Sequence, residues 1–414
     1  MVSEIVTSTL EDMCELIVDC PHSTPKWTDV GVVVLRNQNI RGGVLDLSTP
    51  SYTDESGYLS RVKRAVPQAG DIVITREAPM GEVCVIPEGL KCCLGQRQVL
   101  LRPKHDVSTE YLFWALQSPY VQHQISWNEG TGTTVSNIRI PVLKALKIPR
   151  HGENETILSQ PLSNIASKIE INTKINQTLE KMAQTLFKSW FVDFDPVKAK
   201  MNGEHPKGMD AATASLFPEK LVESELGLIP EGWEPKQLKE VLELAYGKAL
   251  KKTDRVAGDV PVYGSGGLTG YHNQSLIEGP GIIVGRKGTV GSVYWEPKAF
   301  YPIDTVFYVK PKTGYSLKYC HLVLQNLGLK DMNTDAAVPG LNRNNAYRLD
   351  VITPSEPVLK KFEEMMQSFQ SKVDTNNAQN ASLESLRDTL LPKLLSGEID
   401  LENLPVEQAK ALAE

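Results

Sequence analysis

The chain has 414 residues, of which 41% are hydrophobic and 23% charged, as is ordinary for a soluble globular protein of two or three domains. It has no run of about 18 apolar residues, which excludes a membrane-spanning helix. Its first residues lack the basic and apolar regions of a secretory signal, so we expect a cytoplasmic protein with no membrane partner.

The net charge of −6 hides a segregation of charge along the chain. Residues 21–150 carry 15 Lys and Arg against 11 Asp and Glu, and residues 236–321 carry 12 against 7. Residues 355–414 carry 6 against 11. Binding of phosphate depends on local positive potential, so both basic regions are compatible with nucleic acid. Ordinary scatter of charge also produces differences of this size.

The six cysteines contain no CxxC pair. Structural zinc requires paired ligands at loop spacing, so we expect reduced thiols and no metal site.

In chain order, the first clear pattern is GDIVITREAPMGEV at residues 70–83. It predicts a buried strand, an arginine (Arg76), a Gly-containing turn and a second strand. The segment LLRPKHDVSTEYLFWALQS at residues 100–118 then predicts the end of a strand followed by an amphipathic helix, in which Tyr111 belongs to the core.

A long helix is predicted next, because apolar residues between Leu158 and Trp190 alternate at spacings of four and three. Its length is about 50 Å at ~1.5 Å per residue. Two asparagines interrupt this heptad seam at its midpoint, Asn172 and Asn176. The helix ends in a burst of aromatic residues before Pro196, which cannot continue it. We expect these aromatics to cap a second globular body or to dock a partner; they are Phe187, Trp190, Phe191 and Phe194.

The second half repeats this order of elements some 204–210 residues later. The segment PGIIVGRKGTVGSV at 280–293 matches residues 70–83 and aligns Arg76 with Arg286. The segment YVKPKTGYSLKYCHLVLQN at 308–326 matches residues 100–118 and places Tyr319 in the core. A third match aligns Arg139 with Arg343.

The heptad seam also recurs, between Phe362 and Leu394, with asparagines at 376 and 380. Antiparallel pairing would bring Asn172 opposite Asn380 and Asn176 opposite Asn376, and paired asparagines at a seam specify register. Parallel pairing also aligns them, but the connection between the halves favours the antiparallel arrangement. Two separate surface helices are the alternative.

These patterns predict a mixed α+β fold with two tandem α/β domains related by a pseudo-two-fold repeat and separated by an antiparallel coiled coil. The expected boundaries are 1–150 for the first domain, 151–196 for the first long helix, 197–231 for a linker, 232–354 for the second domain, 355–404 for the second helix and its end, and 405–414 for a tail.

Together these residues resemble the specificity subunit of Type I restriction-modification systems over residues 10–404. The resemblance is carried by PHSTPKW, LRNQNIRGG and GDIVITREAPMG in the first half, by SWFVDFDPV and GLIPEGWE at the centre, and by VPVYGSGGLTGYH, IIVGRKGTVGSVYW, YPIDTVFYV and LRDTLLPKLLSGEIDL after it.

The resemblance implies a non-catalytic subunit in which each target recognition domain binds one half of a split double-stranded DNA sequence. It further implies two methyltransferase subunits docked on the helices, together with restriction translocase-nuclease subunits. S-adenosylmethionine, ATP and Mg²⁺ would bind only to those partners, so no cofactor is expected on this chain.

DNA contacts are expected from polar and basic residues in loops, since base edges and phosphates favour such side chains. In the first domain the candidates are His22, Ser23, Thr24, Asn39, Arg41, Arg76, Gln96 and Arg97. In the second they are Lys251, Lys252, Tyr263, Ser265, Gly266, Gly267, Tyr271, Arg286 and Lys287.

Structural roles are the alternative for several of these candidates. The GSGG segment at 264–267 fits a tight turn, the segment at 22–24 fits a turn or helix cap, and Arg76 and Arg286 follow buried strands. A helix cap explains Thr131, Thr133 and Thr134 as well as a DNA contact does.

The sequence contains no GxxxxGK[ST] loop, HExxH or GxSxG motif, and no [DNS]PP[YF] tetrapeptide of amino-methyltransferases. This favours a targeting subunit over an enzyme with an unrecognised site. A protein-binding scaffold, or the targeting subunit of a related phage-defence system, remains an alternative.

Overall fold

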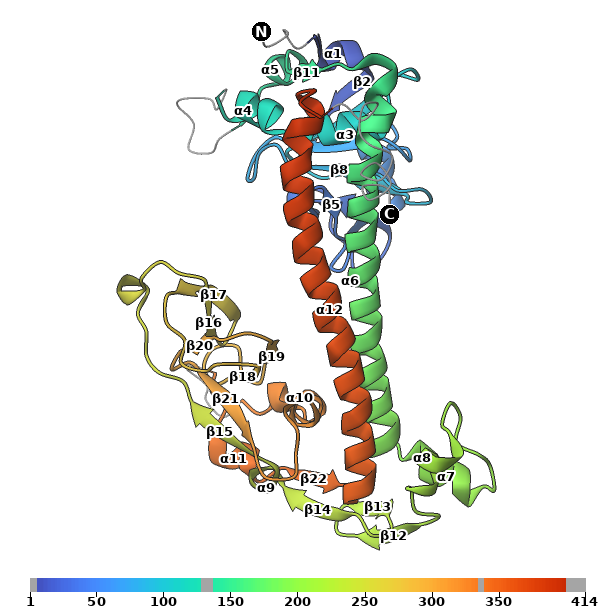
Figure 1. Ribbon diagram of the computed structural model, residues 1–414, viewed down its shortest axis with the longest axis vertical. Coiled ribbons are helices and arrows are strands. Elements are labelled where there is room, and N and C mark those ends of the chain that lie inside the picture. The colour runs from blue at the N-terminus through green and yellow to red at the C-terminus, as the bar shows by residue number, and fades with distance from the viewer. Residues whose placement is uncertain (1–5, 128–136, 334–338, 400–414) are drawn as a thin grey trace. The chain divides into compact units, whose positions relative to one another are not determined.

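The structure of the chain, a computed structural model, describes residues 6–127, 137–333 and 339–399. It divides into two compact units: unit 1 consists of residues up to 173 together with those from 377, and unit 2 consists of residues 174–376. The boundary falls inside the two long helices, α6 (Glu155–Phe191) and α12 (Glu356–Leu395). Each unit therefore contains one globular body and one part of each helix (Figure 1).

Unit 1 is built around a four-stranded sheet in the order β2-β10-β7-β8, with a smaller sheet β6-β3-β9 and the pairs β1-β11 and β4-β5. Its strands are β1 (Thr7–Thr9), β2 (Cys14–Asp19), β3 (Val32–Leu35), β4 (Ile40–Arg41), β5 (Val44–Leu45), β6 (Ser51–Thr53), β7 (Ile72–Thr75), β8 (Val83–Val85), β9 (Cys92–Leu94), β10 (Gln98–Pro103) and β11 (Lys147–Pro149). Its shorter helices are α1 (Leu10–Met13), α2 (Glu55–Arg61), α3 (Thr109–Gln117), α4 (Pro119–Trp127) and α5 (Ile140–Lys144).

Unit 2 repeats this topology, with a four-stranded sheet β15-β21-β18-β19, a smaller sheet β17-β16-β20 and the pair β14-β22. Its strands are β12 (Leu221–Ser224), β13 (Gly227–Pro230), β14 (Glu234–Gln237), β15 (Leu242–Tyr246), β16 (Val260–Gly264), β17 (Gly267–His272), β18 (Gly281–Gly285), β19 (Val293–Glu296), β20 (Tyr301–Pro302), β21 (Val306–Pro311) and β22 (Asp350–Thr353). Its shorter helices are α7 (Asp195–Met201), α8 (Ala211–Ser215), α9 (Leu238–Val241), α10 (Leu317–Asn326) and α11 (Arg343–Tyr347). The predicted mixed fold with two repeated domains is confirmed.

Local chemistry explains the repeated elements. β7 and β18 consist mainly of β-branched residues that are buried on both faces. The helix after each long strand begins at a serine N-cap: Ser108 accepts from the Tyr111 amide in α3, and Ser316 accepts from the Tyr319 amide in α10. Both tyrosines are fully buried, as predicted.

One element of the predicted alignment is shifted by a residue. Arg139 is the N-cap of α5, whereas the N-cap of α11 is Asn342. Arg343 therefore occupies the position of Ile140, and the alignment of Arg139 with Arg343 is wrong. The threonines at 131, 133 and 134 lie outside the described residues.

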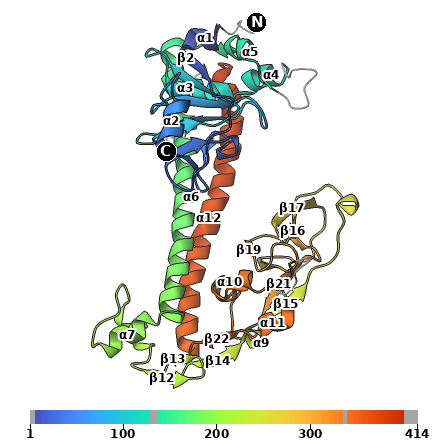
Figure 2. The same cartoon turned by 180° about the vertical axis from the view of Figure 1, so that it is seen from behind.

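The two long helices pack antiparallel, as predicted, and lie side by side in both views (Figures 1 and 2). In unit 1, the Asn172 amide donates to the Asn380 side-chain oxygen and to that of Gln379, each at 2.9 Å. In unit 2, the Asn376 amide donates to the Asn176 side-chain oxygen at 2.8 Å. The expected asparagine pairs are therefore present, one in each unit.

The aromatic residues at the end of α6 are buried in the core of unit 2. Phe191 packs 4.8 Å from the Phe362 ring of α12, and Trp190 packs 4.9 Å from the Phe217 ring. The prediction that they dock a partner is therefore wrong, because the unit's own core covers these rings; they are Phe187, Trp190, Phe191 and Phe194. Their alternative role, capping the second body, agrees with this burial.

Residues 197–231 were expected to form a linker, but they contain most of α7 together with α8 and the β12-β13 hairpin. Val197 and Phe217 from this segment are buried in the unit 2 core. The segment is thus an integral part of unit 2.

Candidate nucleic-acid interface

Unit 1 has an open cleft of about 400 Å³ beside the turn that follows β3. Trp27 is 45% exposed, and the Arg36 guanidinium carbon lies 5.3 Å from its ring centroid. Such a stacked cation and ring provide both positive charge and a flat face for nucleic acid. The cleft is lined by Pro25, Trp27, Arg36, Asn37, Gln38, Ala78, Gly95, Gln96 and Arg97.

Several predicted contacts of unit 1 lie at this cleft or next to it. Gln96 and Arg97 line it, and the Gln96 amide donates to the His22 carbonyl at 2.6 Å. Arg97 is 52% exposed and lies 3.1 Å from a Glu77 carboxylate oxygen. His22, Ser23, Thr24 and Arg41 are exposed. The structure therefore brings together the segments 22–24 and 96–97.

Two predicted contacts of unit 1 have structural roles. Asn39 is 3% exposed, and its side chain accepts from the Arg36 amide and donates to the Asp46 carbonyl, each at 2.9 Å. It therefore holds a turn, and the prediction that it contacts DNA is wrong.

Arg76 is the second of these, because neighbouring acceptors surround its guanidinium. It donates to an Asp19 carboxylate oxygen at 2.8 Å, to the Ile138 carbonyl at 3.1 Å and to the Asn137 side chain at 3.3 Å. Only 11% of the side chain is exposed. Arg76 is thus a largely buried structural bridge, and its engaged guanidinium argues against a direct contact with DNA.

The equivalent arginine of unit 2 has different surroundings. The Arg286 guanidinium carbon lies 4.8 Å from the centroid of the Tyr246 ring, and that of Arg343 lies 4.7 Å from the same ring. Tyr246 is 49% exposed. Among the described residues, no carboxylate lies within ion-pair distance of either arginine. This cluster of two cations on one exposed ring is the strongest candidate for phosphate binding in unit 2.

Sheet register shows that Asp19 and Tyr246 occupy equivalent positions. Asp19 pairs with Val99 in unit 1, and Tyr246 pairs with Phe307 in unit 2. The arginine amides are also held alike, since that of Arg76 donates to the Arg97 carbonyl and that of Arg286 to the Thr305 carbonyl. At this position unit 1 has Asp19, whose carboxylate pairs with Arg76, whereas unit 2 has Tyr246, whose ring contacts Arg286.

The remaining unit 2 candidates lie in several kinds of element: Tyr263 in β16, Gly267 and Tyr271 in β17, Ser265 and Gly266 in the turn between these strands, and Lys251, Lys252 and Lys287 outside the strands. Gly264 pairs with Gly267, so residues 264–267 form the tight hairpin turn between β16 and β17. Gly267 is buried at a φ of +102°, a conformation that favours glycine, and does not present a contact surface. Ser265 and Tyr263 are half-buried. Lys251, Lys252, Gly266, Tyr271 and Lys287 are exposed.

Tyr263 is committed within the unit, because its hydroxyl donates to a Glu296 carboxylate oxygen at 2.8 Å. Burial and this carboxylate raise the pKa of Tyr263. Its side chain is therefore a neutral donor that supports the hairpin.

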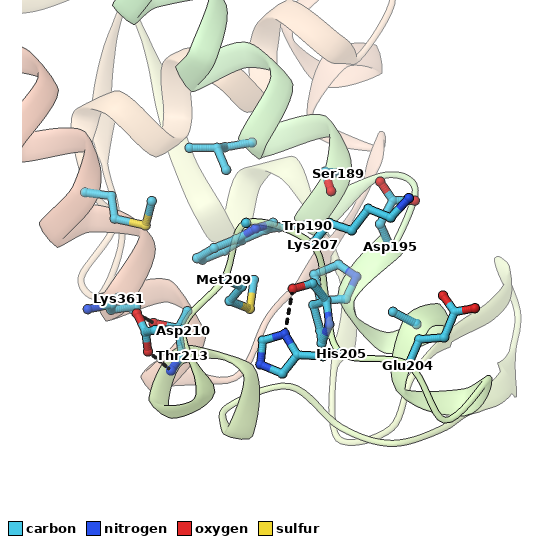
Figure 3. A pocket seen from close by; sticks show the side chains of 16 residues that line it. Ser189, Trp190, Asp195, Glu204, His205, Lys207, Met209, Asp210, Thr213 and Lys361 are labelled. Atoms are coloured by element: carbon cyan, nitrogen blue, oxygen red, sulfur yellow. Dashed lines mark hydrogen bonds between the residues drawn. The ribbon is translucent and has the colours of Figure 1, made fainter.

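A second cleft, of about 430 Å³, lies in unit 2 between the ends of the long helices and the segment 195–213 (Figure 3). Two of its polar side chains have local partners: a His205 ring nitrogen lies 3.0 Å from the Pro206 carbonyl oxygen, and Asp210 accepts from the Thr213 amide and hydroxyl. These contacts stabilise turns and a helix N-terminus, and they assemble no nucleophile with a base.

Across the described ranges, no three His, Cys, Asp or Glu side chains are grouped to hold a metal ion. The six cysteines are free and buried. Burial raises the pKa of Cys84 and Cys92 to about 12, so these thiols are protonated at neutral pH. No helix in the described part of the chain is long and apolar enough to span a membrane.

Sequence reasoning missed four residues of these surfaces: Trp27, Arg36, Tyr246 and Arg343. Trp27 and Arg36 lie within PHSTPKW and LRNQNIRGG, so the motifs marked their segments without singling them out. Tyr246 ends an apolar strand and was indistinguishable from a core residue, and the shifted alignment concealed Arg343.

Comparisons with known proteins agree with this architecture. The family described as the Type I restriction modification DNA specificity domain matches residues 3–181 and 230–385. The HindI specificity subunit of Haemophilus influenzae is 29% identical over 317 residues, covering 62% of this chain and 69% of that protein. The MjaIX specificity subunit of Methanocaldococcus jannaschii is 26% identical over 360 residues, covering 81% and 79%. The crystal structure of the Type I restriction-modification S subunit from M. genitalium is similar in fold, with 20% identity and a TM-score of 0.50 over 95% of this chain and 96% of that one.

Proposed function

The chain belongs to the Type I restriction-modification DNA specificity family, and from this premise we propose that its two units bind the two halves of a split, asymmetric DNA sequence. As a Type I specificity subunit it is a targeting subunit and not a catalyst. Its DNA would be double-stranded and its place of action the cytoplasm.

The observation that supports this proposal is a repeated framework with unlike surfaces. Both units contain the same order of strands, yet unit 2 presents Arg286 and Arg343 around Tyr246, whereas unit 1 presents a cleft with Trp27 and Arg36. Side chains of these types bind phosphates and base edges. Two different surfaces on one framework suit two different half-sites.

The long helices would set the spacing of the half-sites and dock the partners. α6 contains 37 residues, which corresponds to about 55 Å at ~1.5 Å per residue. We propose that two methyltransferase subunits dock on the helical regions and that restriction translocase-nuclease subunits join them. Those partners would bind S-adenosylmethionine, ATP and Mg²⁺.

The decisive experiment is to map the DNA methylation that the complex produces. The chain would be expressed with its neighbouring methyltransferase in an unmethylated host, and modified bases would be mapped by single-molecule sequencing. A split motif with a fixed gap is expected, and exchange of residues 1–150 for those of another family member should change one half only.

A stable complex without any motif would favour the protein-binding scaffold and overturn the proposal. Salt titration separates the two further, because counterion release weakens DNA binding steeply as salt is added.

A further inference from the structure

Arg61, the last residue of α2, is a buried cation whose hydrogen bonds within the described part of the chain all go to backbone carbonyls. It is 7% exposed, and no carboxylate of the described residues lies within ion-pair distance. Its Nε donates to the Leu94 carbonyl at 2.8 Å, its Nη1 to the Ser23 carbonyl at 3.0 Å, and its Nη2 to the Pro21 carbonyl at 3.1 Å and the Gly95 carbonyl at 3.0 Å.

These four carbonyls belong to two segments that are distant in sequence, 21–24 and 94–97. The first contains the exposed residues His22, Ser23 and Thr24, and the second contributes Gly95, Gln96 and Arg97 to the cleft of unit 1. Arg61 itself does not line that cleft. It therefore joins, from behind, the two segments that carry most of the candidate contacts of unit 1.

Only the guanidinium has the geometry for this task. Its planar fork of donors reaches four acceptors at once, whereas a lysine ammonium is a compact point charge with three donors. A buried charge without a carboxylate is also a costly means of stabilising a fold, compared with an apolar side chain of similar volume. The arrangement is better explained by the geometry that it imposes on the two segments.

We propose that Arg61 is a positioning residue for DNA sequence recognition by unit 1, which it serves by holding segments 21–24 and 94–97 in fixed register. This inference rests on the proposed function of unit 1. Arg61 itself would not touch DNA. By fixing the two segments it would determine which bases their side chains accept, and the number of phosphate contacts would stay unchanged.

The test uses the full chain in complex with its methyltransferase and oligonucleotides that carry the mapped motif. Single-base changes are placed in one half-site or the other, and the ratio of cognate to altered affinity is measured for each half. In Arg61→Met the ratio for the unit 1 half should fall at least tenfold, and that for the unit 2 half should stay unchanged. The salt dependence of binding should also stay unchanged.

Two further variants make the result specific. Arg61→Lys keeps the charge and tests the fork geometry if the Met variant does not fold; it should lose most of the same ratio. Val62→Ala is the matched control, because Val62 is the next residue and packs in the small core of Val32, Val34, Tyr58 and Cys93. It should lower the melting temperature while keeping both ratios.

The outcomes separate this inference from the function on which it rests. If the wild-type complex distinguishes sequences and the folded Arg61 variants keep the unit 1 ratio, the inference is overturned and the proposed function stands. An equal loss in Val62→Ala would reduce Arg61 to a stability role and overturn it as well. A wild-type complex without any sequence preference would overturn both.

Discussion

Arg76 and Arg286 show how one framework gives the same residue two different roles. Each follows the buried strand at the same place in its unit, and the backbone amide of each is held by the same kind of bond. Arg76 faces Asp19 and is bound by three groups, whereas Arg286 faces the Tyr246 ring, which it shares with Arg343.

The two arginines differ in whether a neighbouring group neutralises their charge. In unit 1 the carboxylate of Asp19 neutralises the arginine and draws it inward. In unit 2 the aromatic ring contacts the cation without cancelling its charge, so positive potential remains at the surface for an anionic ligand. The DNA recognition that we propose for unit 1 would therefore depend on other side chains, among which Trp27 and Arg36 are candidates.

The largest expected effect is on stability. Arg76→Ala removes one partner of a largely buried ion pair and should lower the free energy of unfolding by about 3 kcal/mol. Arg286→Ala should cost less than about 1 kcal/mol, since the contacts that it removes among the described residues are ring contacts and one bond to the Asp304 carbonyl. Urea unfolding of the two variants measures this difference.

Arg97→Ala is the control for Arg76, because its pair with Glu77 is half exposed and should contribute at most about 1 kcal/mol. Equal losses for Arg76→Ala and Arg286→Ala would remove the distinction between a structural and a surface arginine.

The second effect compares the equivalent helices α3 and α10. Burial lowers the pKa of His321 in α10 to about 4, whereas α3 has Phe113 at this position. The unfolded chain binds a proton below its ordinary pKa of about 6.5, so the free energy of unfolding should fall by roughly 2 kcal/mol between pH 7 and pH 5.

His321→Phe should abolish that component, because the ring then has no site to protonate. Urea unfolding of the wild type and the variant at both pH values gives the comparison. The same pH dependence in the two proteins would show that His321 titrates normally in the folded state.

The third effect concerns binding. Arg286→Ala and Arg343→Ala should each weaken DNA binding about tenfold, which corresponds to ~1.4 kcal/mol. Each should also reduce the slope of log affinity against log salt concentration by about one. Lys312→Ala serves as the control. Lys312 follows the last residue of β21, whereas Thr305, which binds the Arg286 amide, precedes the first residue of that strand. Fluorescence anisotropy over a range of salt concentrations measures both quantities, and a normal salt slope in the arginine variants would count against phosphate contact.

The smallest effect compares the asparagine pairs, one in each unit. Replacing Asn172 and Asn380, or Asn176 and Asn376, by leucine should change the free energy of unfolding by about 1 kcal/mol or less, because buried polar pairs specify register at little gain in stability. Light scattering should detect association of chains through the altered seam. A strictly monomeric protein with lower stability would instead make these pairs ordinary stabilising contacts.

Much of this architecture could be predicted from local patterns. The repeat and the heptad seam with its asparagines follow from residue periodicity, because a helix places every third and fourth residue on one face. The buried strands and their serine-capped helices were predictable for the same reason: each depends on neighbours a few residues away. The antiparallel pairing of Asn172 with Asn380 was predicted from the connection between the halves.

The candidate contacts were harder to predict, because their environment comes from distant segments. Asn39 belongs to LRNQNIRGG, yet the fold buries it under the carbonyl of Asp46. The end of α6 has more aromatic rings than one helix seam needs. Only the packing of Phe217 and Trp233 against these rings showed that they are buried in the core of unit 2.

The sequence by itself determined that this protein is a duplicated α+β chain with two long, register-matched helices, because periodicity and repetition are local properties of a chain. Only the tertiary structure decided which arginine is a bridge, which is a surface cation, and which one holds two distant segments together. That choice depends on the group that folding brings opposite each side chain: Asp19 for Arg76, Tyr246 for Arg286, and four backbone carbonyls for Arg61.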